Sequence, residues 1–185
     1  MLRSTAVLLS TLLVFASCGE QAASTSDTKT TSASVASTSG PRGTKTELSD
    51  KKVEITYFKK KAEMEVRSVT MDFYPTTGEV LRDPKKDGKQ FVRVDLTFKN
   101  TGTDTFKVNY TQAHLDGTTT KDETQTSLIN KTNATDILGV TELAVGETVS
   151  GALYFEVTES EKKEDLSISY KGYDGESKEY AVALK

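Results

Sequence analysis

Hydrophobic residues at every second position are the feature that most limits the fold of this chain. In the segment FVRVDLTFKN, Val92, Val94, Leu96 and Phe98 alternate with polar residues. A period of two predicts a β-strand with one buried face and one solvent-exposed face. The segment VSGALYFEV repeats the pattern, and Gly151 within it predicts a bulge or a close approach of another backbone.

Other segments of the chain show the same alternation. They are KVEITYF, AEMEVRSVTM, FKVNY, LSISY and KEYAVALK. The alternation breaks between Val66 and Val69, which predicts a β-bulge near Arg67 and Ser68. The Asp174-Gly175 pair favours a tight turn, so the last two strands should form a hairpin. Two shorter strands are expected at residues 113–115 and 127–129.

The fold class follows from these strands. Beyond residue 46, no window longer than ten residues sustains a helical period of 3.6, so we expect little helix. Seven to nine short strands separated by turn residues predict an all-β domain over residues 47–185. Its expected architecture is an immunoglobulin-like antiparallel β-sandwich.

The first 17 residues have the pattern of a secretory signal peptide. Arg3 precedes the apolar run AVLLSTLLVFA at residues 6–16, which is too short to span a membrane. Ala16 and Ser17 are small residues, so cleavage is expected just before Cys18.

The segment FASC resembles the lipobox of bacterial lipoproteins. Ala16 and Ser17 match it, whereas Phe15 stands where leucine is usual. The resemblance implies that Cys18 carries a diacylglyceryl group, which would hold the protein at the extracellular face of the cell membrane. An unmodified thiol in a cleaved leader is the alternative. Cys18 is the single cysteine of the chain, so an intrachain disulfide is excluded.

A tether is predicted between this cysteine and the sandwich. Residues 19–46 contain 13 serine or threonine residues among 28 positions and one large aliphatic residue, Val35. Such a segment buries too little apolar surface to offset its conformational entropy. Residues 18–46 are therefore expected to be a lipidated cysteine followed by a disordered tether.

The sandwich region is similar to a known family. The segments KQFVRVDLTFKNTGTDTFKVN, LGVTELAVGETVSGALYFEV and LSISY resemble the telokin-like, immunoglobulin-type domain of unknown function found in exported Gram-positive lipoproteins. The layout is also similar to the immunoprotective extracellular protein group of mycobacteria. Gly146, Glu147 and Glu156 match the family pattern, whereas Val145 and Thr158 replace its usual prolines. The resemblance implies no particular chemistry.

Few residues are suited to catalysis or to metal binding. His114 is the single histidine, and we interpret it as a surface imidazole near a strand end. Asp83 and Asp87 flank two lysines in DPKKDG, which predicts a solvated turn rather than a calcium loop. We therefore expect no enzyme activity, no cofactor and no metal site.

The charges of the chain point away from nucleic acid as a partner. The formal charge is −3, and loss of Arg3 with the signal peptide leaves 23 basic against 27 acidic residues. Binding to nucleic acid needs clustered lysine and arginine. Lys59, Lys60 and Lys61 would form a basic end only if they met the loop with Arg82, Lys85, Lys86 and Lys89 in space; we interpret both segments as solvated loops.

Two functions remain open at this point. The first is a noncatalytic binding or adhesion module that presents its loops or an exposed sheet face to a protein or cell-wall ligand. The second is an accessory or chaperone-like subunit of a cell-envelope complex, in which an edge strand pairs with another protein.

Overall fold

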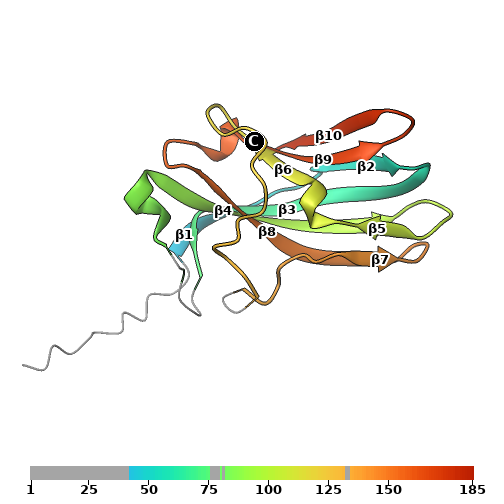
Figure 1. Ribbon diagram of the computed structural model, residues 1–185, viewed down its shortest axis with the longest axis horizontal. Helices are drawn as coiled ribbons and strands as arrows, with labels where there is room; N and C mark the ends of the chain where they lie inside the picture. The colour runs from blue at the N-terminus through green and yellow to red at the C-terminus, as the bar shows by residue number, and fades with distance from the viewer. Residues whose placement is uncertain (1–41, 76–79, 81, 132–133) are drawn as a thin grey trace, which may run out of the picture. The chain divides into compact units, whose positions relative to one another are not determined.

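The computed structural model describes residues 42–75, 80, 82–131 and 134–185, which form an all-β sandwich (Figure 1). This part of the chain contains ten strands, three short 3-10 helices and no α-helix. The strands are β1 (Arg42–Glu47), β2 (Lys52–Tyr57), β3 (Lys60–Tyr74), β4 (Lys89–Asn100), β5 (Phe106–Val108), β6 (Ala113–Asp116), β7 (Thr141–Leu143), β8 (Thr148–Thr158), β9 (Ser167–Tyr173) and β10 (Ser177–Ala183). The 3-10 helices are η1 (Pro84–Asp87), η2 (Tyr110–Gln112) and η3 (Lys163–Asp165). The predicted fold class is confirmed, and the count exceeds the expected seven to nine strands because β1 and β7 were not anticipated.

Eight of these strands form one curved sheet. Its order is β10-β9-β2-β3-β4-β8, with β1 also paired to β3 and β6 paired to β9. Strands β2 and β1 follow one another along the same edge of β3: β2 pairs with its first half and β1 with its second half. Strands β5 and β7 form a separate antiparallel pair. The pairings between the described strands are antiparallel except for one contact between β2 and β9, Tyr57 with Tyr173.

The break in alternation along β3 is a β-bulge, as predicted. Val66 pairs with Leu96 and Ser68 pairs with Asp95, so Arg67 is the extra residue. Because of this residue, Val66 and Val69 both face the core although they are three positions apart. Ser68 is thereby turned to the outer face of the sheet, opposite Asp95.

The main core lies between the two layers of the sandwich. Its aromatic members, Phe98, Phe106, Phe155 and Tyr170, are at most 1% exposed. The rings of Phe98 and Tyr170 lie 5.5 Å apart. The predicted inward faces of β4, β8 and β9 supply much of this core, which confirms the alternation.

A second apolar cluster covers part of the outer face of β3, β4 and β8. Phe73, Phe91 and Tyr154 belong to it, together with Ile129 from the long connection between β6 and β7. This connection runs beside β8, because the backbone N–H of Thr126 donates to Tyr154 and that of Leu138 donates to Ala152. Residues 127–129 form a turn instead of the predicted strand, and that prediction was wrong.

Gly151 explains how this connection approaches β8. A Cβ atom at this position would lie 3.0 Å from Leu138 Cα and 3.1 Å from the Asp136 carbonyl oxygen. The pairing of β4 with β8 continues past Gly151 without a register shift. Of the two predicted alternatives, a close backbone approach is therefore confirmed and a bulge is not.

The predicted boundary between the tether and the sandwich, after residue 46, lies too far along the chain. Residues 42–46, expected to end the disordered tether, form most of β1 and pair with β3. The serine and threonine content suggested disorder, but threonine is also a good strand former when a partner strand offers backbone hydrogen bonds. The predicted signal peptide, Cys18 and tether residues up to 41 lie outside the described residues.

Three of the turns between strands lie at one end of the sandwich. The β9–β10 hairpin forms as predicted, with Gly175 at a φ of 83°. Its turn lies at the same end as the β2–β3 turn and the β7–β8 turn, on the right of Figure 1. Helix η1 and the start of β1 lie at the opposite end of β3, which is fifteen residues or about 45 Å long.

Candidate functional site

A polar groove of about 530 Å³ crosses the outer face of β1, β3, β4 and β8. Its position follows from strand pairing, because opposite residues of antiparallel strands share a face. Its charged and hydroxyl-bearing lining residues are Lys45, Glu47, Arg67, Ser68, Arg93, Asp95, Thr97, Asp136 and Ser150. The exposed sheet face anticipated from the sequence is therefore a concave, charged surface.

Arg93 organises one side of this groove. Its Nε and Nη2 atoms donate to Asp95 Oδ1 at 2.9 and 2.6 Å, and Nη2 also donates to Asp136 Oδ2 at 2.5 Å. The hydroxyl of Tyr154 donates to Asp136 Oδ1 at 2.8 Å, and that of Ser68 donates to Asp95. One guanidinium thus ties the β4 strand to the connection that carries Asp136.

The surroundings of Tyr154 and Arg93 in this network raise the pKa values of both side chains. Burial raises the pKa of the Tyr154 hydroxyl well above its ordinary value, and its hydrogen bond to Asp136 raises it further. Burial lowers the pKa of the Arg93 guanidinium, but its hydrogen bonds to Asp95 outweigh this and the pKa rises. Tyr154 stays neutral and Arg93 stays charged at neutral pH, so Tyr154 is no general base here. Both carboxylates accept hydrogen bonds within the network, Asp95 from Arg93 and Ser68, and Asp136 from Arg93 and Tyr154.

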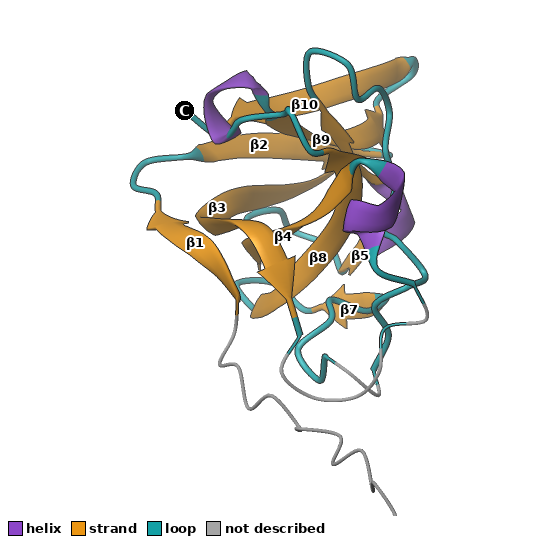
Figure 2. Cartoon of the chain, turned by 90° about the vertical axis from the view of Figure 1, so that its left-hand side faces the viewer, coloured by secondary structure: helices purple, strands orange, loops and turns teal. Residues whose placement is uncertain are grey.

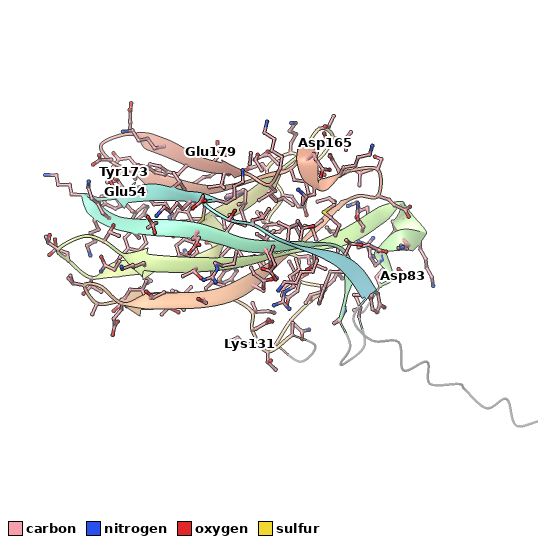
Figure 3. The ribbon with its side chains drawn as sticks, turned by 180° about the vertical axis from the view of Figure 1, so that it is seen from behind. Glu54, Asp83, Lys131, Asp165, Tyr173 and Glu179 are labelled. Atoms are coloured by element: carbon pink, nitrogen blue, oxygen red, sulfur yellow. The ribbon has the colours of Figure 1, made fainter. Side chains whose placement is uncertain are left out.

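Three aromatic rings form a cluster, here called the aromatic tip, at the end of the sandwich that carries the β2–β3 turn. Phe58 lies 4.8 Å from the ring of Tyr57 and 4.9 Å from that of Tyr173. Phe58 is 59% exposed and Tyr173 is 38% exposed. Figure 3 shows Tyr173 and Glu54 at this end of the molecule and Asp83 at the other.

The turn beneath the aromatic tip is conformationally costly. Phe58 and Lys59 have φ values of 50° and 64°, a region that a two-residue hairpin turn normally fills with asparagine and glycine. The turn is nevertheless fixed, because the backbone N–H of Phe58 donates to the Tyr173 carbonyl oxygen at 2.6 Å. A large apolar side chain is therefore held in solvent at a strained backbone position.

The basic end considered from the sequence does not form. Lys59, Lys60 and Lys61 lie at the first end of β3, whereas the loop with Arg82 and Lys85 lies at the other. Arg82 pairs with Asp87 at 2.6 Å and with the buried Glu156 at 2.7 Å. The η1 loop is the turn expected from DPKKDG, with Asp83 accepting the backbone N–H of Lys85.

His114 is not at the surface, so that interpretation was wrong. It lies on β6, is 8% exposed, and places Nδ1 2.9 Å from Asp122 Oδ1 without hydrogen-bond alignment. Asp122 also accepts Lys171 Nζ at 2.5 Å, and this hydrogen bond lowers the pKa of the Asp122 carboxyl. Ser169, the residue opposite His114, is fully buried. A hydroxyl that no substrate reaches is unsuited to nucleophilic catalysis.

Glu161 is a buried carboxylate that sequence reasoning missed. Its oxygens accept the backbone N–H groups of Thr118, Thr119 and Thr120 at 3.2, 2.6 and 2.9 Å, and the Thr119 hydroxyl at 2.8 Å. Burial raises the pKa of this carboxyl, but the hydrogen bonds outweigh burial and lower it to about 2. Gly117 gives the carboxylate room, since a Cβ there would lie 2.7 Å from Oε1. The run GTTT and one of several glutamates in the distant segment EVTESEKKED offer no spacing that predicts this contact.

The predicted lipidation site, Cys18, lies outside the described residues. Among the residues that are described, no helix is long and apolar enough to cross a membrane. No group of three or more histidine, cysteine, aspartate or glutamate side chains in that same part of the chain is placed to hold a metal ion.

Comparison with known proteins identifies the family. Residues 20–179 match the family described as "Domain of unknown function (DUF4352)". The chain belongs to this family. No curated protein matches the chain. The narrower resemblance to telokin-like domains and to the immunoprotective extracellular protein group stays a prediction.

Two solved structures from Bacillus subtilis share the fold of this DUF4352 chain. The "putative lipoprotein (ycdA)" is 17% identical with a TM-score of 0.51, over 74% of this chain and 39% of its own. The yjhA protein is 14% identical with a TM-score of 0.55, over 76% of this chain and all of its own. This chain therefore spans about two fifths of the ycdA protein. At these identities the likeness concerns the fold alone.

Proposed function

We propose that this protein is a lipid-anchored, noncatalytic binding module on the outer face of the cell membrane. Cys18 would carry the lipid, and the sandwich would bind a protein or a cell-wall polymer. The lipobox-like FASC segment supports the anchor, as does the fold shared with a protein named as a putative lipoprotein.

The aromatic tip is the observation that carries the binding role. Phe58 is exposed, flanked by two further rings, and held by a turn that would be more stable with other residues. Aromatic side chains supply large contact areas at low entropic cost and dominate binding interfaces. The tip also lies at the opposite end of β3 from the start of β1, so a membrane anchor upstream of β1 leaves it accessible.

The tip is tested by placing a photo-reactive phenylalanine analogue at position 58 of the full chain in its native cells. We expect a discrete cross-linked product after irradiation. The matched control carries the analogue at Lys86, an exposed position in η1 at the other end of the sandwich. A product that only wall hydrolases release would identify a wall polymer, and a product of defined mass would identify a protein. Equal cross-linking from positions 58 and 86, or none from 58, would contradict the binding role of the tip.

A second prediction separates the role of the tip from folding. Replacing Phe58 by asparagine and Lys59 by glycine should raise the free energy of unfolding by about 1 kcal/mol, because both residues adopt positive φ readily. The same double variant should lose the partner found by cross-linking. Urea unfolding measures the first effect, and pull-down of that partner measures the second. A variant that is more stable and still binds would show that the strained turn serves no recognition.

The second candidate is an accessory subunit of an envelope complex, and one observation favours it. Among the described strands, β1 pairs with β3 along one edge and with no strand along the other. An open strand edge can accept a strand from another chain.

A further inference from the structure

Among the described strands, β1 has one edge that pairs with no other strand. Figure 2 shows β1 at the margin of the sheet, beside β3. The corresponding edge of β8 is covered, because residues 126, 136 and 138 exchange backbone hydrogen bonds with it. The short β1 strand, by contrast, is largely exposed along residues 43–47.

The pairing of β1 with β3 shows which backbone N–H and C=O groups of β1 point toward β3 and which point away from it. The N–H of Leu48 donates to the Arg67 carbonyl oxygen at 2.9 Å, and the pairing continues in register through Thr46 with Val69. Hydrogen-bonded and non-hydrogen-bonded pairs alternate in an antiparallel ladder. The N–H and C=O groups of Thr46 therefore point toward β3, and those of Lys45 and Glu47 point away from it.

We propose that β1 pairs antiparallel with β1 of a second copy of this chain, about a two-fold axis at Thr46. In this register Lys45 lies opposite Glu47 of the partner subunit, and the same pair recurs across the axis. Both residues of each pair have outward-pointing backbone groups, so each pair can exchange two backbone hydrogen bonds. The residues whose backbone groups point outward are therefore the same residues that charge complementarity places opposite each other.

The side chains agree with this register as well. Lys45 and Glu47 share the outer face of the sheet, where both line the polar groove. Directly opposite residues of antiparallel strands also share a face, so each lysine meets a glutamate. In the isolated chain Lys45 Nζ and Glu47 Oε1 already lie 2.6 Å apart. Lone charges on an edge strand oppose edge pairing, but opposite charges two residues apart become complementary when the strand meets its own copy.

The other open edge of the sheet lacks this property. Strand β10 pairs only with β9 among the described strands. Its charged residues Lys178 and Glu179 are adjacent in sequence, so their side chains point to opposite faces. They cannot form the same-face pairs that β1 offers. The two grooves of a β1-linked dimer would become neighbours across the axis, which doubles the surface available to a ligand.

The test is sedimentation equilibrium of residues 19–185, which retain every described element and lack the single cysteine. We expect a concentration-dependent dimer. Lys45→Glu should weaken dimerisation at least tenfold by placing glutamates opposite one another. The exchange Lys45→Glu with Glu47→Lys should restore it to within about threefold of the original chain.

A backbone variant keeps the test independent of charge. Lys45→Pro removes an N–H that points away from β3, so the fold should persist while the dimer is lost; circular dichroism verifies the fold. A monomer at all concentrations up to about 1 mM would overturn the proposal. So would a dimer that tolerates Lys45→Glu, or a charge exchange that fails to restore it. The binding role of the aromatic tip is read separately by cross-linking at position 58, so the two proposals can fail independently.

Discussion

Replacing Glu161 by glutamine is expected to lower the free energy of unfolding at pH 7 by about 3 kcal/mol. The carboxylate is 5% exposed and accepts three backbone N–H groups and one hydroxyl. An amide of the same shape carries no charge and presents an N–H₂ group to donors. The difference between a folded-state pKa of about 2 and the ordinary value of 4.5 corresponds to about 3 kcal/mol.

The same substitution should change the acid sensitivity of the protein. The folded-state pKa of Glu161 is depressed, so its contribution is complete above about pH 4.5 and is lost as the pH falls toward 2. The difference in stability between the original chain and Glu161→Gln should therefore shrink across this window. Urea unfolding at a series of pH values measures it.

Glu159→Gln is the matched control, because Glu159 lies two residues away with an exposed side chain. It should change stability by no more than about 0.5 kcal/mol. A loss in Glu161→Gln that stays constant from pH 7 to pH 2 would contradict a stabilising role for the charge.

The second large effect is expected at Arg93. Arg93→Met keeps an apolar stem near the rings of Phe73 and Tyr154, each 5.7 Å from the guanidinium carbon, but leaves Asp95 and Asp136 without their cation. Asp95 is only 20% exposed. Removing one partner of a partly buried ion pair costs more than losing a surface pair, so we expect a loss of about 2 kcal/mol. Urea unfolding measures this loss. The slope of the free energy of unfolding against urea concentration should stay unchanged.

Two further variants show whether the loss comes from the unpaired carboxylates. Lys99→Met, an exposed change on the same strand, should have almost no effect. Asp136→Asn should recover part of the loss when it is added to Arg93→Met. Equal losses from Arg93→Met and Lys99→Met would exclude the network as a source of stability.

Most of the sandwich could be predicted because alternation reports burial directly. The inward residues of β4, such as Val94 and Phe98, and the bulge at Arg67 follow from sequence spacing alone. Strand β1 was missed because its partner, the second half of β3, lies more than twenty residues away. A threonine-rich strand on an exposed edge has no apolar period, and so resembles a linker in composition.

The candidate sites were harder to predict because they depend on contacts between distant segments. The groove brings Arg93 next to Asp136, and the pairing of Phe58 with Tyr173 joins two separate hairpins. The burial of His114 was not predicted because it results from tertiary packing around β6, which the sequence of a short strand does not indicate. The positive φ at Phe58 follows from the two-residue length of the β2–β3 turn, and that length was readable only once the register was known.

Mass spectrometry of the amino terminus of the protein isolated from its own cells tests the proposed function most directly. The account predicts that residues 1–17 are absent and that the first residue is Cys18 with a diacylglyceryl group on its sulfur. The discovery of a chain that begins at Met1, or of an unmodified Cys18 thiol, would contradict membrane anchoring by this cysteine.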